Sequence, residues 1–244
     1  MDQNYIIEIA TADFSTTAAA VEGGADRIEL CAALTEGGTT PSQGMIRTCR
    51  EHFAVDLFPI IRPRGGDFLY SDEEFEIMKQ DILFCRELQC DGVVAGLLLR
   101  NGNIDIERTK KLIALAYPME FTFHRAFDRC KDPYLAMEEL IDAGCTRILT
   151  SGQQPAAPGG QELIAQLVEK AKGRIVIMPG SGVRKENILE LAQKTKATEF
   201  HSSLRSKSES MMEFRHPAFS SSEESYQNPY INPEEVKALR LALA

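Results

Sequence analysis

Ionisable side chains interrupt several short apolar runs of this sequence, and their types suit proton transfer. Glu8 and Glu29 each lie inside such a run, and Arg62 and His124 lie near the ends of two others. Histidine titrates near neutral pH, and a carboxylate beside it can tune that titration. We therefore predict acid–base chemistry centred on His124 and Glu29. The other catalytic candidates are Arg62, Glu8 and Asp67.

A second set of residues is small and glycine-rich, and it follows three later apolar runs. Backbone N–H groups approach an anion closely at such places, and a following helix adds the positive end of its dipole. Arg62, Arg64 and Arg205 can complement the same anion. The expected anion-binding residues are Arg64, Thr150, Ser151, Gly152, Gly180, Ser181, Gly182, His201 and Ser202. The structural alternative is that these glycines only form tight turns.

Two further interpretations involve the same charged residues. A carboxylate and imidazole set suits Zn, Mn or Fe, and here it would consist of Glu8, Glu29, His124 and His201, without any helical histidine spacing to support it. Alternatively the charges only fill a core and satisfy one another, in a network of Glu8, Glu29, Arg62 and His124.

An alternation of short β-rich runs and longer amphipathic stretches must position these residues. The predicted strands are Tyr5–Ala10, Arg27–Cys31, Leu57–Arg62, Gly92–Leu98, Glu120–Arg125, Arg147–Ser151, Arg174–Met178 and Glu199–Ser203. The predicted helices are Thr16–Glu22, Gln43–His52, Asp72–Leu88, Ile106–Ala116, Pro133–Ala143, Gln161–Ala171 and Arg184–Lys194. Helix caps are expected at Ser42, Ser71 and Asp132, and helix ends at Gly23, Gly144 and Gly173.

Strands separated by helices pair in parallel with right-handed crossovers, and eight such units close into a barrel. We therefore predict an α/β fold, a (β/α)8 TIM-type barrel that forms a single domain over residues 1–244. The region Ser202–Ser225 is rich in Ser, Lys and Glu, so we expect a polar tail from about residue 204. A capped helix over residues 232–244 is expected to complete the outer ring.

In such a barrel the chemistry lies at the C-terminal ends of the strands, and period-two alternation indicates which side chains face the axis. The side chains expected to face it are Arg27, Glu29 and Cys31 on the second strand, Ile60, Arg62 and Arg64 on the third, and Thr122 and His124 on the fifth. Along Glu199–Ser203 the alternation fits either orientation, and both stay open.

Composition bounds the class of protein. The chain has 244 residues, and 27 Lys and Arg against 36 Asp and Glu give a formal net charge of −9. This balance argues against nucleic-acid binding, which depends on clustered cations.

The longest uncharged apolar run is Val93–Leu99, far below the ~20 residues of a membrane helix, and the first residues lack the basic region of a signal peptide. The six cysteines form no C-x-x-C pair and suit reduced, buried thiols. We expect a cytoplasmic protein with a small anionic ligand and with neither nucleic acid nor membrane as partner.

Six runs of the sequence carry a resemblance to a known family. They are Arg27–Cys31, Glu36–Ser42, Ile61–Ser71, Phe123–Asp128, Leu149–Gly152 and Glu199–Ser202. These runs resemble the signatures of the CutC family, and the similarity extends from Ile7 through the tail. The resemblance implies a cytoplasmic TIM barrel linked to copper homeostasis, with Cu(I) as a proposed ligand. It also implies a homodimer, because bacterial members are described as dimers.

For individual residues the resemblance implies less. Thiolate binding of Cu(I) carries over to Cys31, which closes the run Arg27–Cys31. Cys49 lies in no motif and is no secure second ligand, whereas soft-metal sites normally gather two or more sulfurs. The run after the seventh strand departs from the family pattern at Ser181, where another glycine is expected.

Three functions of different classes stay open at this point. The resemblance implies copper homeostasis, with Cu(I) bound through Cys31. The residue types favour an enzyme that acts on a small phosphorylated or carboxylated metabolite, with His124 and Glu29 in acid–base roles and an anion site after strands six to eight. A binding or scaffold barrel without catalysis is the third.

Overall fold

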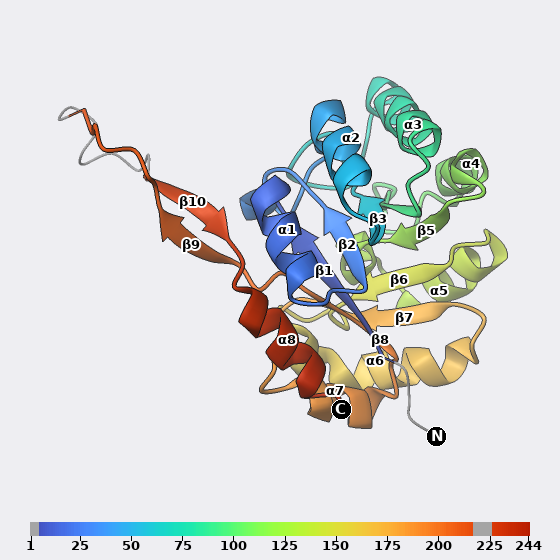
Figure 1. Cartoon of the computed structure of the whole chain (residues 1–244). Coiled ribbons are helices and arrows are strands. Elements are labelled where there is room, and N and C mark those ends of the chain that lie inside the picture. Colours follow the sequence, from blue (N-terminus) through green and yellow to red (C-terminus); the bar gives the residue numbers. More distant parts are fainter. Residues whose placement is uncertain (1–4, 217–225) are drawn as a thin grey trace.

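A computed structural model of the chain describes residues 5–216 and 226–244. Within them, eight strands alternate with helices around a common axis (Figure 1). The strands of the barrel are β1 (Ile6–Thr11), β2 (Arg27–Leu30), β3 (Asp56–Pro59), β4 (Gly92–Ala95), β5 (Glu120–Phe123), β6 (Arg147–Thr150), β7 (Val176–Pro179) and β8 (Glu199–Ser202). The α-helices are α1 (Phe14–Glu22), α2 (Gln43–His52), α3 (Asp72–Glu87), α4 (Ile106–Ala116), α5 (Pro133–Asp142), α6 (Ala157–Ala171), α7 (Ile188–Thr195) and α8 (Pro233–Leu241). Two short 3-10 helices are η1 (Leu34–Glu36) and η2 (Arg125–Arg129).

The strands close into the predicted TIM-type barrel. Parallel hydrogen bonding joins them into two four-stranded halves, in the orders β3-β2-β1-β8 and β4-β5-β6-β7. At one seam Ile60 pairs in parallel with Val94, and at the other β7 and β8 pack side by side. No helix in the described part of the chain is long and apolar enough to cross a membrane.

Local sequence signals explain where most helices begin and end. The side chains of Ser42, Ser71 and Asp132 accept hydrogen bonds from the first turns of α2, α3 and α5, as predicted. Helix α6 begins four residues earlier than predicted, because Pro158 is tolerated in a first helical turn. Helix α7 begins four residues later than predicted, because Asn187 accepts a hydrogen bond from the Arg184 amide and holds a turn there (2.9 Å).

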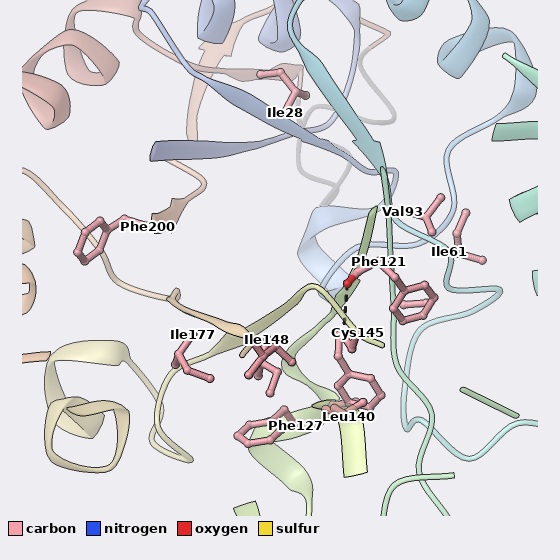
Figure 2. Packing of buried hydrophobic residues seen from close by; sticks show 14 of the residues in the cluster. Ile28, Ile61, Val93, Phe121, Phe127, Leu140, Cys145, Ile148, Ile177 and Phe200 are labelled. Carbon is pink, nitrogen blue, oxygen red and sulfur yellow. Dashed lines mark hydrogen bonds between the residues drawn. The ribbon is translucent and has the colours of Figure 1, made fainter. Parts of the chain in front are cut away.

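The main core lies between the strands and the helices that cover them. Ile28, Ile148, Ile177 and Phe200 project from four different strands into this layer (Figure 2). In the same layer the Cys145 thiol donates to the carbonyl oxygen of Phe121, at 3.3 Å (Figure 2). The alternate residues of β2, Arg27 and Glu29, therefore face the barrel axis, as the alternation predicts.

A network of ion pairs fills the N-terminal end of the barrel. Arg27 Nη1 lies 2.7 Å from Glu199 Oε2, and Arg147 Nε lies 2.5 Å from the same oxygen. Arg147 also pairs with Glu120 at 3.0 Å, and both guanidinium groups stack on Phe58. The four charged residues begin their strands, so this network lies at the end of the barrel opposite the candidate site.

The polar tail is more structured than the sequence analysis predicts. Its described ends form an antiparallel ribbon, β9 (Ser206–Glu209) with β10 (Gln227–Tyr230), that projects from the barrel (Figure 1). Backbone hydrogen bonds form this ribbon, and its residues lack the apolar alternation that signals a half-buried strand. Residues 217–225 of the predicted polar region, like residues 1–4, lie outside the described residues. The predicted closing helix is α8, which packs against α1 at Gly23 and Val236.

Candidate functional site

A cavity of about 150 Å³ opens at the C-terminal ends of the barrel strands. This is the end at which TIM barrels carry their active sites. The ionisable residues that line it are Glu29, Arg62, His124, Arg125, His201 and Arg205. Of the predicted catalytic residues, the structure thus brings Glu29, Arg62 and His124 to one cavity.

Glu8, His201 and Glu29 form a line of buried titratable groups that ends in this cavity. Parallel pairing of β1 with β8 sets Glu8 beside His201, and Glu8 Oε1 lies 2.7 Å from His201 Nδ1. The other ring nitrogen, Nε2, lies 3.8 Å from Glu29 Oε2. Glu8 is fully buried and also lies 3.4 Å from Arg27 Nη1.

The environment shifts the pKa values of all three groups. Burial favours neutral Glu8, but the hydrogen bond from His201 and the nearby positive charges hold its pKa below the ordinary value. Burial likewise opposes a charged His201, yet its bond to Glu8 and the charge of Glu29 raise the pKa of the imidazole. For Glu29, burial dominates and raises the pKa of the carboxyl against the pull of His201. The surroundings thus favour the ionised form of Glu8 and the protonated forms of His201 and Glu29.

His124 lies apart from that line and is electrically neutral. Its Nδ1 accepts a hydrogen bond from the Ala126 amide at 3.2 Å, which begins η2. Burial and the charge of Arg62 lower the pKa of this imidazole to about 3. The second ring nitrogen, Nε2, is buried and has no hydrogen-bond partner in the part of the chain that the structure describes.

Arg62 holds two loops of the cavity wall together. Its Nη1 donates to the carbonyl oxygens of Glu36 and Gly38 at 2.9 and 2.7 Å, and its Nη2 donates to that of Gly66 at 2.8 Å. The network expected of Glu8, Glu29, Arg62 and His124 is therefore wrong. Strand register, which the sequence does not reveal, gives Glu8 the partners Arg27 and His201 instead.

The orientation of β8 is resolved by its pairing with β1. His201 and Ser203 face the cavity, whereas Ser202 faces the helices. The Ser202 hydroxyl donates to the carbonyl oxygen of Val183 at 2.8 Å, and Arg184 donates to it at 3.1 Å. The predicted anion contact of Ser202 therefore lies outside the cavity, and Ser203 takes its place in the lining.

The chain's own carboxylate fills the predicted anion site after β6. Asp128 accepts hydrogen bonds from Thr150 Oγ1 (2.5 Å) and from the amide of Ser151 (2.9 Å). It also accepts from the Ser151 hydroxyl and from the Gln153 amide, and it pairs with Arg125. Thr150 and Ser151 thus serve Asp128, and neither they nor Gly152 line the cavity.

The glycine-rich turn after β7 is only partly in the cavity. Ser181 and Gly182 line it, with the positive φ values of 73° and 71° that such a turn requires. The Ser181 hydroxyl donates to the carbonyl oxygen of Pro155 at 3.0 Å. Gly180 does not line the cavity. Its amide donates to Thr150, and a side chain there would meet Leu149, so this glycine serves close packing.

Two predicted residues of the loop after β3 lie outside the cavity. Asp67 is exposed and pairs with Arg64 at 3.1 Å. Arg64 also lies 2.5 Å from Glu74 Oε1 and stacks on Tyr70. These contacts hold the loop in shape, and neither residue lines the cavity.

The donor groups of the barrel do not fit the metal sites considered above. Within the described residues, no group of three or more His, Cys, Asp or Glu side chains is arranged to hold a metal ion, so the set of Glu8, Glu29, His124 and His201 is not one. The Cys31 thiol lies 3.5 Å from Glu29 Oε2 on the axial side of β2. Cys49 lies in the outer layer instead, 3.8 Å from Met45 Sδ. Burial and the charge of Glu29 raise the pKa of the Cys31 thiol well above its ordinary value.

Sequence reasoning gave no role to Arg125, Asp128 or Phe68, whereas it placed Ser203 beside Ser202 at the expected anion site. Arg125 and Asp128 stand inside the recognised run Phe123–Asp128, but only the neighbouring position of β6 shows what Asp128 binds. Phe68 comes from the long loop after β3, and its ring lies 4.9 Å from that of His124. Aromatic residues in a loop carry no signal of such a position.

The fold and cavity together define a TIM-barrel protein with buried acid–base groups at the C-terminal face. The family model for CutC matches residues 5–206. A CutC family protein of Chromobacterium violaceum is 48% identical over 241 residues, 98% of each chain. The human copper homeostasis protein cutC homolog is 46% identical over 211 residues, 86% of this chain and 77% of that one.

Solved structures agree. A CutC crystal structure from Streptococcus agalactiae is 34% identical, with a TM-score of 0.78, over 81% of this chain and 98% of that one. N-(5'-phosphoribosyl)anthranilate isomerase from Pyrococcus furiosus, 11% identical with a TM-score of 0.58, shares the fold over 98% of both chains. The chain belongs to the CutC family and is a homologue of the copper homeostasis protein CutC.

Proposed function

We propose that this chain is an enzyme that moves protons on a small anionic metabolite, with Glu29 and His201 as its acid–base groups. The observation that carries the proposal is the buried line from Glu8 through His201 to Glu29, which ends in the cavity. Glu8 holds Nδ1 of the imidazole and leaves Nε2 for proton exchange on the side of Glu29. Neighbouring titratable groups with displaced pKa values in a cavity are typical of acid–base catalysis.

The charge of the cavity supports an anionic substrate. The chain as a whole carries −9, yet three arginines and His201 line the cavity against one carboxyl group, Glu29. Among the described residues, neither Arg62 nor Arg205 pairs with a carboxylate, because both donate to backbone carbonyl oxygens. Such guanidinium groups retain a charge for a phosphate or carboxylate of the substrate. No lysine lines the cavity in the described residues, so the acid–base groups rather than a Schiff base carry the chemistry.

Direct binding of Cu(I) through Cys31 is the competing function, and the names of the relatives favour it. The residues present do not fit it well. A thiolate is the copper ligand, whereas the buried Cys31 thiol beside Glu29 keeps its proton. The contacts of its sulfur are with Glu29 oxygens, at 3.5 and 3.8 Å. We therefore assign no step to copper.

The compartment and assembly belong to the same proposal. We place the enzyme in the cytoplasm, because six free and buried thiols suit a reducing compartment. We expect a homodimer, which the family resemblance implies, and light scattering of the purified protein measures it.

Thermal denaturation of the reduced, metal-free protein tests the proposed function. The ligands are a panel of small phosphorylated and carboxylated metabolites, inorganic phosphate and Cu(I). A ligand at ~100 times its Kd adds ~2.7 kcal/mol of stability and raises the Tm. We expect an anionic metabolite to raise it in the wild type and in Arg100→Ala, an exposed control, but not in Arg205→Ala. A rise with Cu(I) alone, lost in Cys31→Ser, would support the copper function instead.

The acid–base assignment makes a separate prediction for Glu8→Gln. Removal of the Glu8 charge takes away the contact that raises the pKa of His201, so this pKa falls. An NMR titration of the histidine rings measures it, with the surface variant Glu234→Gln as control. An unchanged His201 pKa in Glu8→Gln would refute the role of Glu8.

A further inference from the structure

We infer that the cavity takes a substrate with a carbonyl group and that His124 Nε2–H donates a hydrogen bond to the carbonyl oxygen. The substrate class is then a small oxo acid or oxo phosphate. This inference rests on the proposed function, because it concerns the same cavity, and it adds the group on which the acid–base chemistry acts.

The proton of His124 is placed by its surroundings. Nδ1 accepts a hydrogen bond from the Ala126 amide, and a backbone amide can only donate. The neutral ring therefore carries its proton on Nε2. A side chain added at Gly96 would lie 2.5 Å from Nδ1, so the main chain just after β4 closes the Nδ1 side of the ring.

The Nε2–H group is a buried donor that lacks an acceptor. His124 is only 4% exposed, and its Nε2 has no partner in the described residues. Buried donors in proteins are nearly always paired, and an unpaired one is costly. A ligand oxygen in the cavity would supply the missing acceptor.

Arg62 makes the position suitable for a negatively charged oxygen. Its positive charge is close enough to contribute to the lowered pKa of His124, and its donors hold the loops in place. A neutral imidazole beside a fixed positive charge can polarise a carbonyl group and stabilise the enolate formed from it.

The reaction that fits these groups needs no further reactant. The Glu29 carboxylate takes a proton from the carbon next to the carbonyl group, and the electron pair of the broken C–H bond forms a C=C bond. The C=O π pair moves to oxygen, and this enolate oxygen accepts from His124 Nε2–H. Return of the proton from Glu29 to the same carbon reverses the step, whereas a proton from His201 to the enolate oxygen completes the isomerisation to the enol.

Phe68 packs against both His124 and Arg62 in this structure. Its ring lies 4.9 Å from the His124 ring and 5.1 Å from the guanidinium carbon of Arg62. Its main chain is held, because the Leu98 amide donates to the Phe68 carbonyl oxygen at 2.9 Å. The proposed contact therefore requires the Phe68 side chain, and not its main chain, to move when a ligand binds.

The test compares ligands that differ in the carbonyl group alone. Pyruvate and propionate have the same charge and nearly the same size, and dihydroxyacetone phosphate and glycerol 3-phosphate differ as C=O and CH–OH. A cavity of about 150 Å³ suits such small molecules. In at least one pair, we expect calorimetry to give a Kd at least tenfold lower for the ligand with the carbonyl group. The ligand without it leaves the His124 Nε2–H donor unpaired.

Two variants of His124 distinguish loss of the hydrogen bond to the ligand from a general loss of folding. In His124→Asn, the side-chain oxygen can still accept from Ala126, but the amide is too short to reach the Nε2 position. In His124→Gln, the amide reaches it. We expect the preference for the carbonyl ligand to disappear in the first variant and to persist in the second. In the ¹⁵N spectrum of the wild type, the His124 Nε2–H signal shifts when the carbonyl ligand binds.

The outcomes distinguish this inference from the proposed function. Equal affinity for both members of every pair in the wild type, with anion binding intact, overturns the carbonyl contact and leaves the anionic-metabolite function standing. A preference that persists in His124→Asn, when that variant is folded, also overturns it. Failure of every anion in the panel overturns the proposed function, and the inference falls with it.

Discussion

His124 and His201 line the same cavity, yet their neighbours shift their pKa values in opposite directions. His201 is buried between two carboxyl groups, which raise its pKa despite that burial. For His124, burial and the positive charge of Arg62 both disfavour the protonated imidazole, and they lower its pKa to about 3. In the proposed function, His201 is the imidazole that exchanges protons, and His124 is the neutral hydrogen-bond donor. The sequence analysis assigned the acid–base role to His124, and the structure favours His201 for it.

The lowered pKa of His124 predicts a loss of stability in acid. The unfolded chain binds this proton near pH 6.5, whereas the folded chain does so only near pH 3. The stability that neutral His124 contributes is therefore complete above pH 6.5 and is lost as the pH falls towards 3, by about 2 kcal/mol at pH 5. Urea denaturation at pH 7 and pH 5 measures this, and His124→Asn should lose about 2 kcal/mol less than the wild type.

The comparison of two variants isolates this effect from the other titrating groups. His201, with its raised pKa, gains relative stability as the pH falls through that pKa, and this gain is common to the wild type and His124→Asn. Equal pH dependence of the two proteins would show that His124 is protonated in the folded state at pH 5.

At the scale of strands and helices, the site is built from strand ends whose neighbours leave no room for larger side chains. Gly96, just after β4, has the clearest constraint, because an added Cβ would lie 2.5 Å from His124 Nδ1. Gly96→Ala is expected to displace the ring, break its bond to Ala126 and cost roughly 1–3 kcal/mol of unfolding free energy.

The matched control for Gly96→Ala is Gly159→Ala in the first turn of α6. The nearest atom to an added Cβ there is 3.7 Å away, and alanine favours a helix. Chemical denaturation should show destabilisation of the first variant only. Equal stability of both variants would mean that His124 moves aside without cost.

Alternation along single strands was predictable from the sequence, and contacts between strands were not. The apolar positions Ile28 and Leu30 assign Glu29 to the barrel axis, and His124 follows in the same way on β5. On β8 both faces carry mixed residues, so only pairing with β1 turns His201 inward and Ser202 outward. The occupied anion site at Ser151 depends on Asp128, more than twenty residues away in the chain and one strand over in the barrel. Such partners follow from barrel geometry and strand register.

Over the whole molecule, the two ends of the barrel have different physical roles. At the N-terminal end, Arg27 and Arg147 both pair with Glu199, and Arg147 also pairs with Glu120. At the C-terminal end, within residues 5–216 and 226–244, the His124 donor is unpaired and the Arg62 charge has no carboxylate partner. A buried charge is costly without a partner, so an uncompensated one in a cavity is typical of a site where a ligand supplies the partner. The uncompensated charge of Arg62 in the cavity supports the proposed function there.

The ribbon of β9 and β10 begins at Ser206, where the match to the family model ends, and it projects from the barrel, so we expect the barrel to fold without it. Ser206 pairs directly with Tyr230, so replacement of residues 207–229 by Asn-Gly closes the chain with a short turn. We expect the unfolding free energy to change by less than about 1 kcal/mol, because a two-stranded ribbon contributes little alone.

Val236→Ala in α8 is the control for the shortened chain, because this side chain is fully buried against Gly23 and its loss should cost roughly 1–3 kcal/mol. Arg205 precedes the ribbon and donates to the Leu34 carbonyl oxygen at 2.6 Å, so ligand binding at the cavity should survive the replacement. Denaturation, calorimetry and light scattering of the shortened chain test these expectations together. If the shortened chain becomes monomeric and loses several kcal/mol, the ribbon is an interface between two copies, and its exposed strands are buried in the assembly.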